Sequence, residues 1–153
     1  MANIPFNIAK GKVNEYYDRV KGNDPAASAL VLIPIETAGL ETDAVLIDKD
    51  TVADVLSGAT NEQTTMGRKV LTDTELAAVP APDDTNDRNE RSLPQVTWVA
   101  AGGNAISKIL VAYDADTGAG TDANLVPLTL FDAAATPDGN NIVLQAGLFF
   151  RAG

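Results

Sequence analysis

The C-terminal half of the chain alternates short apolar runs with polar turns. The runs are rich in β-branched and aromatic residues, as strands are, and small acidic turns such as DADTGAGTDAN and TPDGNN separate them. This pattern predicts antiparallel β-structure. The expected strands are Val96–Ala100, Ile106–Asp114, Leu125–Phe131 and Ile142–Phe150, the last of them broken at Gly147.

Two of these strands carry a signal for their place in the sheet. Ile106–Asp114 is apolar on both of its alternating faces, which predicts a central strand that is buried on both sides. Pro127 lacks the backbone N–H that pairing with a neighbour requires, so Leu125–Phe131 is expected at an edge.

The N-terminal half begins with helical periodicity. Val13, Tyr16, Tyr17 and Val20 recur at the i, i+3, i+4 and i+7 spacing that places side chains on one face of a helix. The opposite face is charged. This spacing predicts a helix over Gly11–Lys21.

Shorter elements are expected between the two halves. The apolar run Ala29–Ile35 predicts a strand, and Pro34 places its end at an edge or a bulge. Asp50 or Thr51 can cap a short helix that continues to Leu56. Two further elements are expected, a short strand over Arg68–Leu71 and a helical turn over Thr72–Val79 with Glu75 in the capping-box position.

The segment Pro80–Pro94 interrupts this pattern. It reads PAPDDTNDRNERSLP and has almost no apolar residues, so it predicts an exposed loop or arm. The whole chain, residues 1–153, is expected to form a single domain. The expected fold is mainly β, with an antiparallel β-sandwich or barrel-like core and one or two short helices in the N-terminal half. An α+β fold is the alternative.

Composition narrows the chemistry. The chain has no cysteine and no histidine, which excludes disulfides, thiolate and imidazole metal ligands, and nucleophiles of the cysteine or Ser-His-Asp type. We therefore expect no catalytic residue and no cofactor.

A net charge of -10 disfavours nucleic acid and anionic membranes as partners. The N-terminus does not read as a signal peptide, so the protein is expected to be made and kept in a cytosol, or to leave it inside an assembled particle.

Two motifs in the β-rich half suggest ligands. Gly118–Ala123 fits the G-x-G-x-x-A turn of dinucleotide-binding proteins, but a strand pattern follows it where a helix is needed, so we expect a glycine-rich hairpin loop. Asp114, Asp116 and Asp122 fall at positions 1, 3 and 9 of a calcium loop, whereas Leu125 stands where a bidentate glutamate belongs. An irregular calcium site at these aspartates stays open, with a solvated hairpin as the alternative.

Carboxylates are the remaining candidates for catalysis. A glycan hydrolase needs only two suitably spaced acidic residues, and Asp132, between Phe131 and Ala133, comes nearest to the apolar setting that raises a carboxyl pKa. A glycan hydrolase or glycan-binding module is therefore the alternative from another functional class. One Trp and three Tyr leave few aromatic platforms for sugars, which argues against it.

The uneven distribution of charge suggests where the protein binds. The N-terminal segment has a small excess of basic residues, whereas Ile109–Phe150 contains five aspartates and no lysine or arginine. A basic segment on an acidic protein suits docking on another acidic protein surface, and an exposed phenylalanine near the C-terminus suits a homo-oligomer, a trimer or a dimer. The residues expected to contact a partner or another copy are Phe6, Lys10, Lys12, Arg19, Lys21, Arg88, Arg91 and Phe149.

Three stretches resemble structural proteins of tailed bacteriophages: FNIAKGKVNEYYDRVK, VLTDTELAAVPAPDDTNDRNE and YDADTGAGTDANLVPLTLFDAAATPDGNNIV. They cover most of the chain and are similar to capsid decoration, or cement, proteins. The resemblance implies a non-enzymatic virion protein that sits on the outside of the capsid shell, binds the major capsid protein and stabilises the shell. A head-to-tail connector or tail component of the virion is the alternative. The proteins that these stretches resemble often have His-Asp where this chain has Phe131-Asp132, and no role is tied to that position.

Overall fold

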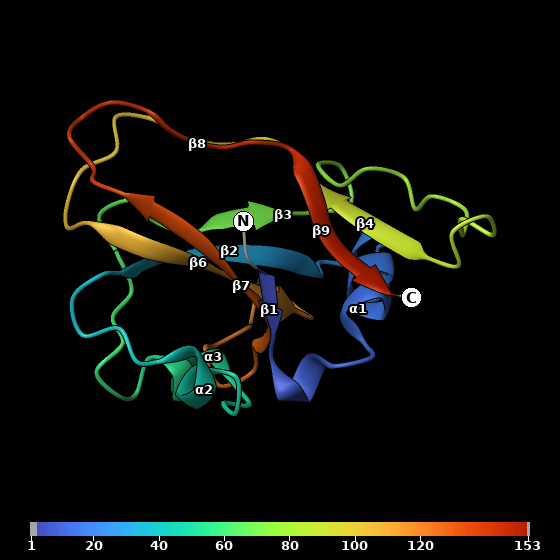
Figure 1. Ribbon diagram of the computed structural model, residues 1–153, viewed down its shortest axis with the longest axis horizontal. Helices are drawn as coiled ribbons and strands as arrows, with labels where there is room; N and C mark the ends of the chain where they lie inside the picture. The colour runs from blue at the N-terminus through green and yellow to red at the C-terminus, as the bar shows by residue number, and fades with distance from the viewer. Residues whose placement is uncertain (1–2, 153) are drawn as a thin grey trace.

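An antiparallel sheet of five strands, in the order β1-β7-β6-β2-β3, forms the centre of the protein (Figure 1). The structure is a computed structural model, and it describes residues 3–152. Two more antiparallel pairs, β4 with β9 and β5 with β8, lie outside this sheet. The mainly β fold is confirmed. The strands are β1 (Asn3–Pro5), β2 (Ala29–Glu36), β3 (Lys69–Leu71), β4 (Asn89–Leu93), β5 (Val96–Trp98), β6 (Ile106–Asp114), β7 (Val126–Ala135), β8 (Ile142–Leu144) and β9 (Gly147–Ala152).

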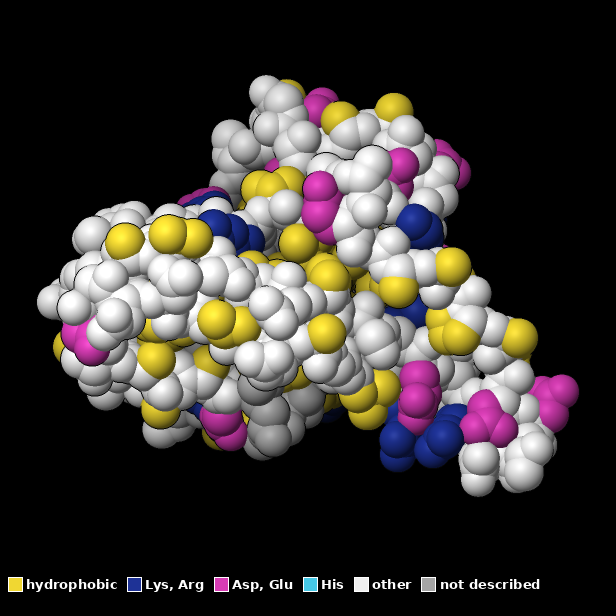
Figure 2. All heavy atoms as spheres, turned by 90° about the horizontal axis from the view of Figure 1, so that it is seen from above, with side chains coloured by type: hydrophobic (Ala, Val, Ile, Leu, Met, Phe, Trp, Pro, Cys, Tyr) yellow, Lys and Arg dark blue, Asp and Glu magenta, His cyan; other side chains and the backbone are white. Residues whose placement is uncertain are grey.

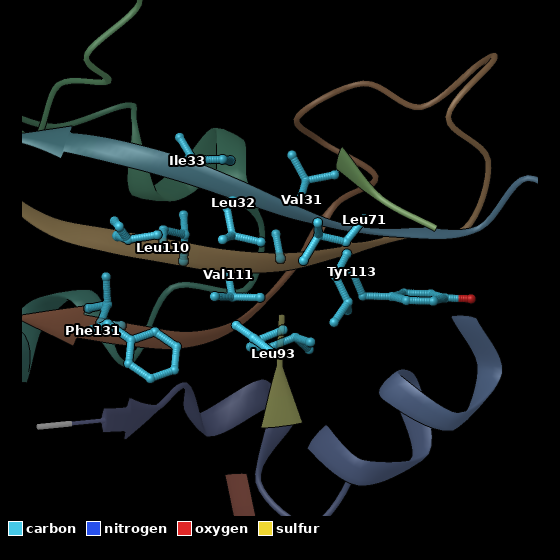
Figure 3. Close-up of a cluster of buried hydrophobic side chains, with 14 of the residues drawn as sticks. Val31, Leu32, Ile33, Leu71, Leu93, Leu110, Val111, Tyr113 and Phe131 are labelled. Carbon is cyan, nitrogen blue, oxygen red and sulfur yellow. The ribbon is translucent and has the colours of Figure 1, made fainter. Parts of the chain in front are cut away.

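The middle of the sheet is built from strands that are buried on both faces. Leu110 and Val111 on β6 pair with Ile33 and Leu32 on β2, and all four side chains are fully buried (Figure 3). Such a strand has no face for solvent, so it must be covered on both sides and flanked by neighbours. The central position predicted for β6 is confirmed.

Two of the prolines within the sheet, Pro34 and Pro127, lie beside irregularities in strand pairing. The register of β2 against β6 shifts just after Pro34, as the sequence predicts. Pro127 on β7 pairs with Ala112 where the register of β6 against β7 shifts. The edge position predicted for β7 is wrong, because β1 pairs with it from Thr129 to Phe131. Pro127 lies beyond the end of β1, and the bulge accommodates its missing backbone donor.

Two helices form where their sequence signals predict them. Val13, Tyr17 and Val20 on the longest helix are buried, which confirms the predicted apolar stripe. Thr51 accepts a hydrogen bond from the N–H of Asp54 at 3.0 Å, so it is the predicted cap. The helical elements are η1, a 3-10 helix (Asn7–Ala9), α1 (Val13–Lys21), α2 (Asp43–Leu46) and α3 (Val52–Val55).

The turn after β3 begins at Thr72 with the predicted capping contact, but it spans only residues 73–75 and does not continue to Val79. The N–H of Leu76 donates to the carbonyl of Thr72, and the Glu75 carboxylate accepts from the N–H of Thr72 at 2.7 Å. This is the return half of a capping box. Hydrogen bonds from the hydroxyl and N–H of Thr72 lower the pKa of Glu75.

Only part of Pro80–Pro94 is the exposed loop that its composition predicts. Residues 80–88 form a loop, but Asn89–Leu93 is strand β4, on which Arg91 and Leu93 are buried. The prediction is wrong for β4 because Arg91 occupies an inward position. A charged inward residue removes the alternation of apolar and polar positions by which a strand is recognised.

Three short elements had no sequence signal. β1, η1 and α2 are three or four residues long, which is too short for either periodicity to repeat. By contrast, the predicted break at Gly147 is confirmed, because β8 ends at Leu144 and β9 begins at Gly147. The glycine-rich segment before β7 leads into a strand rather than a helix, as expected.

Candidate binding surfaces

The aspartates considered for calcium do not converge. Asp114 is buried, its carboxylate accepts from the N–H of Asp116 at 3.0 Å, and a Cβ on Gly120 would come within 2.5 Å of that carboxylate. Asp122 binds Arg68 instead. Among residues 3–152, no group of three or more acidic residues is arranged to hold a metal ion.

Arg68 joins two loops through its guanidinium. Its Nε donates to Glu62 at 2.8 Å, and one of its terminal nitrogens donates to Asp122 at 2.6 Å. These hydrogen bonds, donated to Glu62 and to Asp122, raise the pKa of Arg68, and those to Glu62 have the larger effect. The bond with Arg68 also holds the pKa of Asp122 below its usual range. The glycine-rich loop is thus anchored to the segment that precedes β3.

Asp132 is also part of an ion pair. Its carboxylate lies 2.6 Å from the Lys108 ammonium, which is 3.0 Å from Asp43 at the start of α2. Burial of Lys108 acts to lower its pKa, but the hydrogen bonds that its ammonium donates to both carboxylates outweigh burial and raise it. The side chain of Asp132 is 54% exposed, so the apolar setting that would suit an acid catalyst is not present. This cluster fastens α2 to the sheet.

Three residues expected at a contact surface are buried. Phe6 is fully buried beneath the sheet edge, where its N–H donates to the carbonyl of Leu128. Arg91 is 3% exposed and binds Asp18 on α1. Phe149 is fully buried beside Tyr17. Contact roles for Phe6, Arg91 and Phe149 are therefore wrong for the folded chain.

The placement of Phe149 has a clear physical reason. The register of β4 against β9 shifts so that Arg91 pairs with Phe150 and Ser92 with Leu148. Phe149 is the extra residue of this bulge, and its ring turns inward to lie 6.1 Å from that of Phe131. Phe149, expected at a contact surface, is thus buried, and the neighbouring Phe150 is partly buried.

The four N-terminal cations have different environments. Lys10 and Lys12 are exposed, and within the described residues neither side chain has an ion pair or a hydrogen bond. Arg19 binds Glu15 at 2.9 Å, and this hydrogen bond raises its pKa. Lys21 donates to the carbonyl of Asp73 at 2.7 Å. Among the four predicted N-terminal cations, Lys10 and Lys12 are therefore the two that are exposed and make no ion pair or hydrogen bond within the described residues.

Residues 80–88 form an arm that projects beyond the strands at the right of Figure 1. At its base Asp83 and Arg88 exchange backbone hydrogen bonds and form an ion pair of 2.9 Å. Arg88 also lies 3.4 Å from Glu90, which binds Arg151 on β9 at 2.6 Å. Hydrogen bonds from Asn86 and Arg88 lower the pKa of Asp83. The charge ladder Asp83-Arg88-Glu90-Arg151 thus fixes the arm on the β4–β9 pair.

An apolar groove lies between the end of β7 and the segment β8–β9. It consists of two adjoining hollows of about 530 and about 200 Å³, both of which include Leu144 and Gln145 in their walls. Figure 2, which looks onto this side, shows hydrophobic side chains along the hollowed part of the surface. The large exposed apolar residues at the groove are Val143, 39% exposed, and Leu148, 46% exposed. Sequence reasoning missed both, because their outward direction depends on pairings that alternation alone does not specify.

Comparison with known proteins identifies no relative. The chain matches no protein-family model, no curated protein and no solved structure. Within residues 3–152, no helix has the length and apolar character needed to span a membrane. The function is therefore inferred from the surfaces described above and from the resemblance of the sequence.

Proposed function

We propose that this chain is a non-enzymatic structural protein of a tailed-bacteriophage virion. In this proposal it binds the major capsid protein on the outside of the capsid shell and stabilises the shell as a decoration protein. The resemblance of three stretches of sequence to such proteins supports the virion assignment. The β frame with a projecting arm supports a binding role.

The observation that carries the binding role is the arm, residues 80–88. Asp84, Thr85, Asn86 and Asp87 at its tip are all exposed, yet the charge ladder at its base holds the arm in a defined shape. A preformed arm loses less conformational entropy on binding than a flexible loop does. Many weak contacts of this kind, repeated over a shell, add up to firm attachment.

The distribution of charge supports docking through the N-terminal side. Lys10 and Lys12 are exposed cations on a chain of net charge -10. Such cations can steer the protein onto an acidic patch of the shell. The aspartate-rich loops of the β half would then face solvent and keep decorated particles mutually repulsive.

The two carboxylates with the best claim to chemistry support a structural role instead. Asp132 binds Lys108, and Asp122 binds Arg68. The Lys108 ammonium lies between the carboxylates of Asp132 and Asp43, and these interactions raise its pKa. These side chains hold elements of the fold together. That structural role is sufficient in a protein that binds a partner without catalysis.

Sedimentation with capsid shells tests the proposal. Shells of the phage that carries this coding sequence, assembled without the protein, are mixed with purified protein and pelleted. Saturation at many copies per shell, in a fixed ratio to the major capsid protein, is expected of a decoration protein. Saturation at a few copies would favour the connector or tail alternative. Cell-wall glycan turnover that disappears in Asp132→Ala would overturn the non-enzymatic assignment.

A further inference from the structure

We infer that the apolar groove between β7 and β8–β9 is a self-association surface for a second copy of this chain. The two copies pack about a two-fold axis, and Leu148 of each copy enters the groove of the other. This inference concerns the protein in solution, so it does not rest on the proposed function. It specifies a dimer and the face through which it forms.

The shape of the surface favours a second copy. A two-fold interface uses the same patch on both partners, so that patch must contain both projecting and hollow parts. Leu148 on β9 projects, with 46% of its surface exposed, and it borders the hollow of about 530 Å³. Val143 on β8 projects in the same way beside the adjoining hollow of about 200 Å³. The same patch therefore contains both the projecting side chains and the hollows that would receive those of the second copy.

Charge favours the same face. Two chains of net charge -10 repel each other, so they can associate only where their surfaces carry little charge. Arg151 is the one charged residue that lines the larger hollow, and Glu90 neutralises it at 2.6 Å. The smaller hollow is lined without any charged residue. A core depleted in charge with apolar side chains is the usual composition of a protein interface.

The surroundings of the groove fit a protein better than a small ligand. A ligand site combines apolar walls with several converging polar groups that fix orientation. Here Gln145 and Arg151 are the polar side chains among the lining residues, and Arg151 already binds Glu90. Strand β8 forms part of the wall through Ile142, Val143 and Leu144, and Val143 is the one of these three whose side chain is exposed.

Sedimentation equilibrium with matched variants tests the inference. Leu148→Asp places a charge at the centre of the proposed interface, whereas Val70→Asp changes an equally exposed residue, 48%, on edge strand β3 outside the groove. The natural sequence is expected to form a dimer that dissociates on dilution. Leu148→Asp should raise the dimer dissociation constant at least about tenfold, and Val70→Asp should leave it unchanged.

The effect of salt on the dimer dissociation constant distinguishes an apolar interface from an electrostatic one. Added NaCl should strengthen the dimer, because it screens repulsion between two acidic chains and leaves apolar contact intact. Circular dichroism and urea midpoints establish that each variant is folded; if Leu148→Asp does not fold, Val143→Asp takes its place. A natural chain that is monomeric at all concentrations, a trimer, or equal effects of the Leu148 and Val70 changes would overturn the inference. Shell binding by a monomeric Leu148→Asp would leave the proposed function standing.

Discussion

The guanidinium of Arg91 on β4 binds the carboxylate of Asp18 on α1 through two hydrogen bonds, 2.5 and 2.7 Å long. Arg91 is 3% exposed and also bonds to Asn89, so its charge is fully satisfied inside the protein. In the described chain, neither β4 nor β9 pairs with a strand of the five-stranded sheet. The pair Arg91–Asp18 is one of the links between the arm-bearing β4–β9 pair and α1, beside the hydrogen bond from the Tyr17 hydroxyl to the Ser92 carbonyl.

Asp18→Ala should destabilise the protein because it leaves the buried Arg91 without its counter-charge. We expect the free energy of unfolding in urea to fall by about 2 kcal/mol. Glu15→Ala is the matched control, since it removes an ion pair on the same helix whose two side chains are half exposed. Its cost should stay below about 0.5 kcal/mol. Equal losses in the two variants would show that Arg91 does not depend on Asp18.

Acid should release the anchor between Arg68 and Asp122. Because the pKa of Asp122 is lower in the folded protein than in the unfolded chain, its stabilisation is complete above the unfolded pKa, near 3.9, and is lost as the pH falls through the folded value. Urea unfolding of the natural chain and of Asp122→Asn, measured from pH 7 downward, should show a stability difference that shrinks below about pH 4. A difference that stays constant to lower pH would contradict this role for Asp122.

The exposed pair Lys10 and Lys12 should govern the salt dependence of shell binding. The double change to serine is expected to weaken binding at low salt and to flatten its dependence on NaCl, because screened cations no longer contribute. Changing Lys49 and Lys69 to serine removes the same net charge elsewhere. If both double variants bind alike, net charge rather than the N-terminal surface determines docking.

The arm should loosen locally without loss of global stability when Asp83 is changed to Ala. Asp83 accepts hydrogen bonds from Asn86 and Arg88 at the base of the arm. Cleavage of residues 84–87 by an aspartate-specific protease should become faster, while the urea midpoint changes little, because these residues lie outside the core. Asp138→Ala alters a comparable exposed turn closed by Asn140. Unchanged cleavage within the arm would show that the charge ladder does not hold it.

The sequence predicted correctly those elements in which the pattern of apolar and polar residues repeats several times. The stripe of Val13, Tyr17 and Val20 and the apolar run of β6 gave the right element in the right place. Prediction failed at β4, where Arg91 points inward because Asp18, far away in the sequence, accepts its hydrogen bonds. Burial of Phe149 likewise depends on a bulge that forms only when β4 and β9 pair.

The candidate surfaces were predictable to a smaller extent. Lys10 and Lys12 are as exposed as their sequence setting suggests, and much of the expected loop is the arm. The groove could not be anticipated, because β7 and β8–β9 meet only in three dimensions and bring Ala133 beside Leu144. Surfaces assembled from separate segments depend on the fold rather than on any local pattern.

Cryo-electron microscopy of the tailed-phage virions in which the proposal places this chain tests the central proposal most directly. The proposal predicts density for the β frame at repeated positions over the whole outer shell, with residues 80–88 or the segment around Lys10 and Lys12 against the major capsid protein. Particles made without the coding sequence should lack that density. Density for this chain at a single vertex, along the tail, or nowhere on the virion would contradict the proposal.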